Sequence, residues 1–226
     1  MRRKTLERIN QGLLVFTALV AVVTVLLFVG WRSPGLPLSR GADLVLSVLN
    51  PVKKVGIVAG HWPDDSGAVC PDGTREVDIN YAVAVKVVNS LRALGCRAEL
   101  LGEFDPALQG YEAEVFVSLH ADSCISGASG FKLARAEQSA VPEEEDRLVD
   151  CLYAEYEEAT GLDRHEGSIT PDMLYYHTFR RIAPETPGAI IEMGFMADDA
   201  AILLGEQDLV AQGIVNGILC FLEESD

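Results

Sequence analysis

The chain has five cysteines but no Cys-x-x-Cys pair. This absence argues against a thiolate zinc site and against a thioredoxin-like redox motif. Basic residues are also few: 18 lysines and arginines stand against 34 aspartates and glutamates, which gives a formal net charge of −16. Nucleic acid and anionic lipid headgroups are therefore poor candidates for partners. Internal repeats and low-complexity segments are missing as well, so at 226 residues we expect one ordinary folded domain with an appendage.

One segment lacks charge altogether. Residues 12–30 read GLLVFTALVAVVTVLLFVG and are about as long as the roughly 20 residues that a helix needs to cross a bilayer. Because four basic residues precede this run, the positive-inside rule places residues 1–11 in the cytoplasm and the rest of the chain on the extracytoplasmic side. A cleaved signal peptide, which would leave a secreted protein, has the same charge pattern, but no small-x-small cleavage site follows. We therefore expect a transmembrane signal anchor at residues 12–30.

The rest of the chain alternates between strand-like and helix-like segments. Residues 31–53 contain three prolines and are predicted to form a linker, so that the folded domain covers residues 54–226. The expected strands are 54–60, 97–101, 114–121, 130–136 and 188–195, and the expected helices are 76–95, 143–161 and 206–224. This alternation predicts an α/β fold with a mostly parallel central sheet and helices on both faces.

Three polar residues stand where strands are expected to end. His61 follows the first strand, His120 ends the third and Glu192 lies near the end of the last. In parallel sheets, ligands bind beyond these carboxyl ends. Glu76 begins a helix after the loop that follows His61, and two imidazoles with one carboxylate form a set that zinc takes in hydrolases. His61, Glu76 and His120 are therefore candidate zinc ligands, although a lone histidine can also serve as a structural hydrogen-bonding group.

Glu192 is the candidate catalytic group. It lies within the apolar run AIIEMGF, where an unpaired charge would be costly. Amide hydrolysis at a metal needs a group that takes a proton from the attacking water and passes it to the leaving amine, and a second carboxylate can do both. We therefore assign this role to Glu192.

Three stretches carry a resemblance to a known family. GIVAGHWPDDSGAVCPDGTREVDIN, VFVSLHADS and TPGAIIEMGFMADD, in this order, resemble the motifs of the zinc-dependent N-acetylmuramoyl-L-alanine amidases of the Amidase 3 type. The resemblance covers Lys54 to Leu222. It implies an amidase fold similar to that of zinc exopeptidases, and hydrolysis of the amide between N-acetylmuramic acid and L-alanine in peptidoglycan.

The resemblance also implies the site and its partners. It implies one zinc ion per chain held by His61, Glu76 and His120, with Glu192 as the catalytic carboxylate. Asn80 falls on an asparagine of the family motif and is expected to support the ligands. Peptidoglycan is the expected partner, the membrane is contacted through residues 12–30, and no protein partner is predicted.

Other residues are weaker candidates. His177 lies in a segment that often lines the pocket in the family, and Arg164 lies near a position where the family has an arginine; both are candidates for supporting the metal ligands or for binding substrate. If the compartment is oxidising, Cys70 and Cys124 are the cysteines to test for a disulfide, since each follows a candidate ligand in a loop; alternatively, all five cysteines are buried or inert thiols. The chain also departs from the family at Trp62, which replaces a glycine and makes the rim of the site bulkier.

Two other functions are compatible with the same residues. A zinc peptidase or amidohydrolase could use the same residues on another amide, because fold and metal do not fix the substrate. A non-catalytic scaffold with the same fold is the other alternative. Zinc content separates the scaffold from the two enzymes.

Overall fold

The structure is a computed structural model that describes residues 52–224. The predicted cytoplasmic residues 1–11, the predicted anchor at 12–30 and nearly all of the predicted linker at 31–53 lie outside the described residues. Within the described part of the chain, no helix combines the length and the apolar character that crossing a membrane requires.

Five strands form one sheet in the order β2-β1-β3-β5-β4. They are β1 (Lys54–Ala59), β2 (Arg97–Gly102), β3 (Val115–Asp122), β4 (Lys132–Ala134) and β5 (Gly188–Phe195). β1 pairs in parallel with β2 and β3, and β3 pairs in parallel with β5. The predicted, mostly parallel sheet is confirmed. β4 is shorter than predicted and forms an antiparallel edge on β5.

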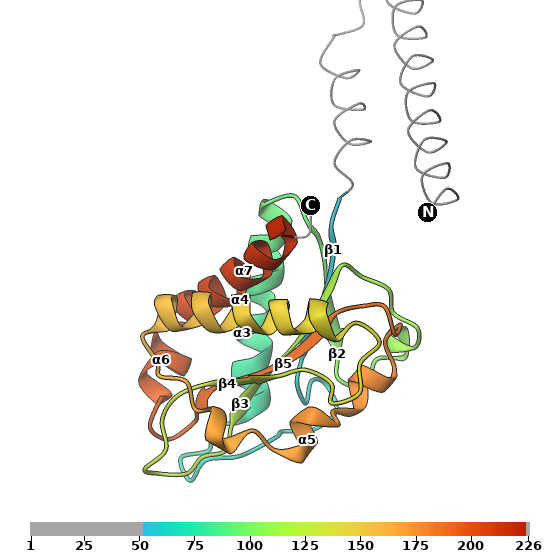
Figure 1. Ribbon diagram of the computed structural model, residues 1–226. Helices are drawn as coiled ribbons and strands as arrows, with labels where there is room; N and C mark the ends of the chain where they lie inside the picture. The colour runs from blue at the N-terminus through green and yellow to red at the C-terminus, as the bar shows by residue number, and fades with distance from the viewer. Residues whose placement is uncertain (1–51, 225–226) are drawn as a thin grey trace, which may run out of the picture. The chain divides into compact units, whose positions relative to one another are not determined.

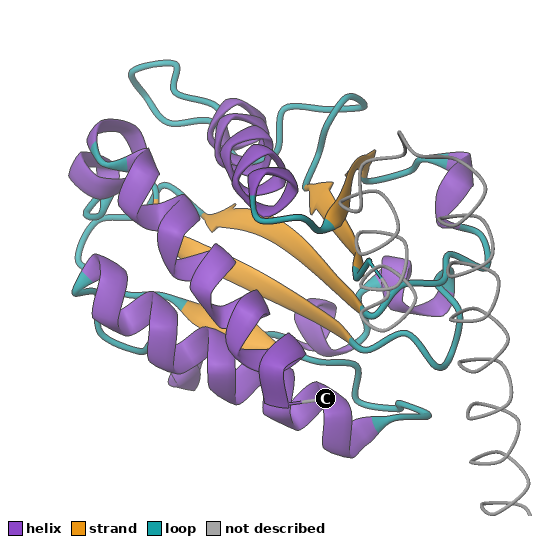
Figure 2. Ribbon diagram, turned by 90° about the horizontal axis from the view of Figure 1, so that it is seen from above, coloured by secondary structure: helices purple, strands orange, loops and turns teal. Residues whose placement is uncertain are grey.

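Three long helices pack together on one face of this sheet (Figure 1). They are α3 (Glu76–Ala93), α4 (Pro142–Thr160) and α7 (Gln207–Glu224), with the short α6 (Ala200–Gly205) preceding the last. Alternate strand residues such as Val117, Leu119 and Ile191 are fully buried in the same hydrophobic cluster as Val83 of α3 and Leu152 of α4. The apolar strand residues and the apolar faces of the helices therefore pack in one main core. Figure 2 shows the strands lying side by side.

The opposite face is covered differently, which corrects the prediction of helices on both faces. Only short helical segments lie there: α5 (Pro171–Leu174) and the 3-10 turns η1 (Pro106–Leu108), η2 (Glu166–Ser168) and η3 (His177–Arg180). Two small clusters form this side, one around Phe116 and Tyr111 and one around Ile190 and Met173. Prolines and glycines occur in both segments that cover this face, residues 103–114 and 162–187, and the helical turns that form there are short. This thinly covered face carries the polar residues of the site.

Candidate active site

Strand register places the candidate catalytic residues next to each other. His120 of β3 pairs with Glu192 of β5, and Glu192 pairs with Lys132 of β4. Since paired residues in a sheet point to the same side, the three side chains form a row on the thinly covered face. His61 follows β1, on the other side of β3 from β5. The sheet order therefore sets His61, His120 and Glu192 in sequence across the carboxyl edge.

The loop after β1 brings the first histidine into position. The ring of His120 packs directly against the backbone of Gly60. Any residue other than glycine would place a Cβ inside that ring. His61 itself adopts a left-handed backbone conformation, with φ at 66°. Its ring Nε2 lies 3.2 Å from Glu76 Oε1. Gly67, further along the loop, has a φ of +58°, and a Cβ there would press on both Glu76 and His61.

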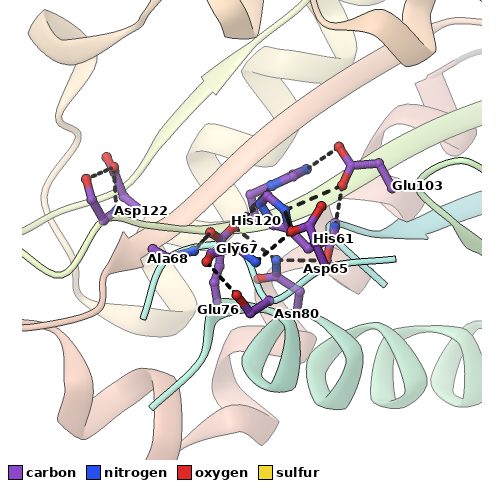
Figure 3. A network of polar contacts seen from close by, with 12 residues as sticks. His61, Asp65, Gly67, Ala68, Glu76, Asn80, Glu103, His120 and Asp122 are labelled. Atoms are coloured by element: carbon purple, nitrogen blue, oxygen red, sulfur yellow. Dashed lines mark hydrogen bonds and ion pairs between the residues drawn. The ribbon is translucent and has the colours of Figure 1, made fainter. Parts of the chain in front are cut away.

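Glu76 is the centre of a polar network at the first residue of α3 (Figure 3). Its Oε1 lies 3.1 Å from Nδ1 of His120 and accepts a hydrogen bond of 3.1 Å from Nδ2 of Asn80. Its Oε2 accepts from the backbone N–H of Ala68 at 3.0 Å. The same Asn80 amide donates to the carbonyl of Gly60 at 3.2 Å. Asn80 thus joins the helix to the loop and lies directly behind two of the proposed ligands.

The three predicted ligands fit a metal ion. One ligand atom from each of His61, Glu76 and His120 lies within 4.8 Å of the other two. Two imidazole nitrogens and a carboxylate oxygen are donors that zinc binds, and three protein ligands leave a further position for water or substrate. Glu76 and His120 are both buried, so their placement is determined by the fold.

The electrostatics of the cluster favour positive charge. Hydrogen bonding to Glu76 raises the pKa of His61 to about 9, against the opposing effect of burial. Burial alone would raise the pKa of Glu76, but hydrogen bonds from His120 and His61 outweigh it and hold that pKa well below its usual range. Burial also opposes the charging of His120, yet Glu76 and the neighbouring carboxylates raise its pKa. A carboxylate that keeps its charge between two histidines is a site where a cation can replace a proton.

Two carboxylates at the site, Asp65 and Glu103, were not predicted from the sequence. Asp65 Oδ1 lies 2.7 Å from Nδ1 of His61, on the ring side that faces away from Glu76. Glu103, just past the end of β2, accepts a hydrogen bond from the backbone N–H of His61. It also accepts one from the hydroxyl of Tyr176 at 3.1 Å, and this hydroxyl lies 3.4 Å from Nε2 of His120. Glu103 was predictable in one respect, because it too follows the carboxyl end of a strand.

Glu192 has the surroundings of a proton-transfer group. Its Oε2 is buried and has no hydrogen-bond partner among the described residues. Burial raises the pKa of Glu192 to about 7, with His120 opposing and the carboxylates of Glu76 and Asp122 adding to the rise. Lys132 also opposes the rise, and its ammonium lies 2.5 Å from Asp122 Oδ2. A carboxyl group near half ionisation at neutral pH can both accept and donate a proton.

A pocket of about 500 Å³ opens beside this row. His120 and Glu192 line it together with Lys132, and Tyr176 and His177 close it from the opposite segment. Its size is within the usual range for small-molecule sites, about 300–1,000 Å³.

The remaining predicted residues have mixed placements. His177 lies in the pocket, with Nε2 3.0 Å from Glu103 Oε1. Arg164 is not brought to the site: it is exposed and pairs with Glu157 at 2.9 Å. Cys70 and Cys124 form a disulfide, which ties the loop between His61 and Glu76 to the loop after His120. A second, unpredicted disulfide joins Cys151 to Cys220, and Cys96 is free.

This fold and site together define an α/β protein with a two-histidine, one-carboxylate centre of the kind found in metal-dependent hydrolases. The chain belongs to the Amidase 3 family, described as N-acetylmuramoyl-L-alanine amidase, whose sequence profile matches residues 55–220.

The chain is similar to one uncharacterised protein and to several named amidases. The chain is 28% identical to YqiI, an uncharacterised protein of Bacillus subtilis strain 168, over 76% of this chain and 86% of that protein. It is 25% identical to the N-acetylmuramoyl-L-alanine amidase AmiC of Neisseria meningitidis serogroup B, over 74% of this chain but only 52% of AmiC. Among solved structures, the catalytic domain of the amidase CwlV from Bacillus (Paenibacillus) polymyxa var. colistinus is similar with a TM-score of 0.58 and 27% identity, over 76% of this chain and 99% of that domain.

Proposed function

We propose that this chain is a zinc-dependent cell-wall amidase that cleaves the amide between the lactyl group of N-acetylmuramic acid and the L-alanine of the stem peptide. The observation that carries the proposal is the convergence of His61, Glu76 and His120 within 4.8 Å, with Glu192 next to His120 in the sheet register. Membership of the Amidase 3 family supports the choice of this amide over another.

The residues of the chain define what each would do in the reaction. His61, Glu76 and His120 would hold one zinc ion, which supplies Lewis acidity at the amide carbonyl. Glu192 takes a proton from the attacking water as the carbon–oxygen bond forms. It then donates that proton to the nitrogen as the carbon–nitrogen bond breaks, so the products are a lactyl carboxylate and a free L-alanine amine. Burial, which raises the pKa of Glu192 to about 7, suits it to both steps.

The test is hydrolysis of purified peptidoglycan by the full chain, with bound zinc quantified. We expect about one zinc per chain and release of free stem peptides. Glu192→Gln keeps the shape of the side chain but cannot accept the proton, so we expect a rate loss of about 10²–10⁴-fold with zinc retained. Glu185→Gln, at an exposed position just before β5, is the matched control and should retain full activity. Bound zinc without peptide release would assign the site to a different amide.

We further propose that residues 12–30 anchor the chain in the membrane, with residues 1–11 in the cytoplasm and the catalytic domain on the extracytoplasmic side, next to its peptidoglycan substrate. The uncharged run and the basic residues before it support this placement. Membrane fractionation tests it: the intact chain should stay with the membranes after a high-salt wash, whereas a shortened, secreted chain would show that the segment is cleaved.

A further inference from the structure

A second, smaller hollow lies beside the metal ligands and has no role in the chemistry described above. It has a volume of about 320 Å³, at the low end of the range for small-ligand sites. Its lining comes from the loop after β1 and from the start of α3: Trp62, Pro63, Asp65, Arg75, Val77, Asp78 and Tyr81. Asp65 connects it to the centre, because the same carboxylate lies 2.7 Å from the ring of His61.

Two aromatic rings form the wall of this hollow. The centroids of Trp62 and Tyr81 lie 4.9 Å apart with 34° between the ring planes. Trp62 is partly exposed, and Tyr81 is 38% exposed on the surface of α3. Exposed aromatic side chains with a polar rim are typical of binding surfaces, because one ring combines a large apolar face with a polar edge.

The polar groups around the rings restrict what can bind. The carboxylates of Asp65 and Asp78 are more than half exposed, and Arg75 is paired with Asp78 at 2.6 Å. These groups accept from and donate to hydroxyl and amide groups. Two carboxylates against one already paired cation disfavour an anionic ligand at this hollow. An uncharged ring with an apolar C–H face and hydroxyl groups on its edge, such as an N-acetylated sugar, matches both the rings and the charges.

The direction of the reaction places the sugar on this side. Glu192 protonates the leaving amine, so the peptide must lie on the Glu192 side of His120, where the 500 Å³ pocket opens. The acyl half of the substrate, which carries the sugar, must extend the other way. In the sheet order, β1 lies across β3 from β5, and Trp62 directly follows the ligand His61 after β1. The aromatic hollow is therefore on the acyl side.

We propose that the hollow lined by Trp62 and Tyr81 binds an N-acetylated sugar ring of the glycan strand, and that the larger pocket is left to the stem peptide. This inference rests on the proposed function, because it is the amidase reaction that assigns the two sides.

A binding experiment tests the proposal independently of catalysis. The chain has two tryptophans, so Trp31→Phe in the full chain leaves Trp62 as the single fluorescent tryptophan. Titration with the peptide-free tetramer of N-acetylglucosamine should change its emission in a saturable way. Tyr81→Ala should weaken this binding about tenfold, whereas Leu94→Ala, a 60% exposed apolar position just past the other end of α3, should not. Tyr175→Ala probes the larger pocket, which Tyr175 lines. Loss of binding in Tyr175→Ala but not in Tyr81→Ala, or no saturable change at all, would overturn the proposal.

A hydrolysis experiment with two substrates separates this proposal from the amidase function. One substrate carries the muramic acid ring and the other is the same peptide with only the lactyl group. We expect Tyr81→Ala and Trp62→Phe to lower kcat/KM about tenfold on the first and to leave the second unchanged. Equal effects on both substrates would count against a sugar site. If the wild type cleaved neither substrate, the amidase function would fail, and the tetramer titration would still decide whether the hollow binds sugar.

Discussion

At the scale of single residues, Glu103 is an unpredicted carboxylate that links three parts of the site. It is 5% exposed and binds the backbone of His61, the hydroxyl of Tyr176 and the ring of His177. Burial opposes its ionisation, but His120 and the hydrogen bonds from His177 and His61 lower its pKa, so it is a carboxylate at neutral pH. Its charge therefore adds to the attraction of the centre for a cation. Its hydrogen bond from the backbone N–H of His61 helps to position that proposed metal ligand.

Replacing Glu103 by glutamine tests this role. Glu103→Gln keeps the size of the side chain but removes the charge, and its amide cannot accept hydrogen bonds at both oxygen positions. Because groups that orient ligands typically contribute 10–100-fold to metal affinity, we expect zinc affinity to fall by about that factor. Competition with a chelator measures it. Glu112→Gln, at an exposed position in the same inter-strand segment, should leave the affinity unchanged; equal losses in both variants would rule out a specific role.

The sequence predicted that His61, His120 and Glu192 lie together because each stands in a motif at or near the end of a strand, and the structure places them at one edge of the sheet. Glu76 was found because it starts a helix after a turn-rich loop. Neither Asp65 nor Glu103 was singled out, because their role depends on contacts that the sequence does not show. Glu103 lies 42 residues from the His61 N–H that it binds. Arg164 was predicted to lie near the pocket, but its guanidinium forms an ion pair with Glu157 of α4 instead.

At the scale of elements, α4 carries a buried acid at its first turn. Glu145 is 4% exposed, accepts a hydrogen bond of 3.2 Å from the N–H of Gly188 at the start of β5, and has an Oε2 with no hydrogen-bond partner among the described residues. Burial raises the pKa of Glu145, against hydrogen bonds that lower it. The helix thus anchors the strand of Glu192 through a carboxyl group that resists ionisation.

This gives a pH-dependent prediction. Because the pKa of Glu145 is higher in the folded chain than in the unfolded chain, the folded state binds more protons at pH values between the two, and the stability that Glu145 contributes at low pH is lost as pH rises through the folded pKa. Glu145→Gln keeps an acceptor for Gly188 and removes the charge. We expect its midpoint of thermal unfolding to exceed that of the wild type at pH 7, with the difference shrinking toward pH 4. Glu143→Gln, exposed on the same turn, should show no such trend.

Long elements were predictable and short ones were not. The three long helices and the five strands follow from apolar periodicity, and their bounds differ from the predictions by a few residues. The segments that cover the second face contain prolines and form turns of three or four residues, which produce no periodic pattern. The pocket of the site lies on that face. The positions of the residues that cover it, such as Tyr176, therefore could not be predicted from the sequence.

At the scale of the whole molecule, two disulfides stabilise different parts of the domain. Cys70–Cys124 has a sequence separation of 54 and joins the loop between His61 and Glu76 to the loop that follows β3, the strand of His120. Cys151–Cys220 has a sequence separation of 69 and joins α4 to α7, within the layer of long helices. In the chain-entropy account, each bond stabilises the folded state by about 4 kcal/mol. The two bonds thus contribute similar amounts to the stability of the folded state, but only the first lies next to the site.

This difference gives the last prediction. Replacing either pair by serines should lower the free energy of unfolding by a similar amount, about 4 kcal/mol, as measured in urea. Only Cys70→Ser with Cys124→Ser should also weaken zinc binding, because it releases the loop between His61 and Glu76 from the loop that follows the strand of His120. Cys151→Ser with Cys220→Ser is the matched control, since it loses the same kind of bond on the helical side of the sheet. If both double variants bound zinc equally well under conditions where both are folded, the first disulfide would serve stability alone. The metal centre would then be held by the buried contacts of Glu76 and His120.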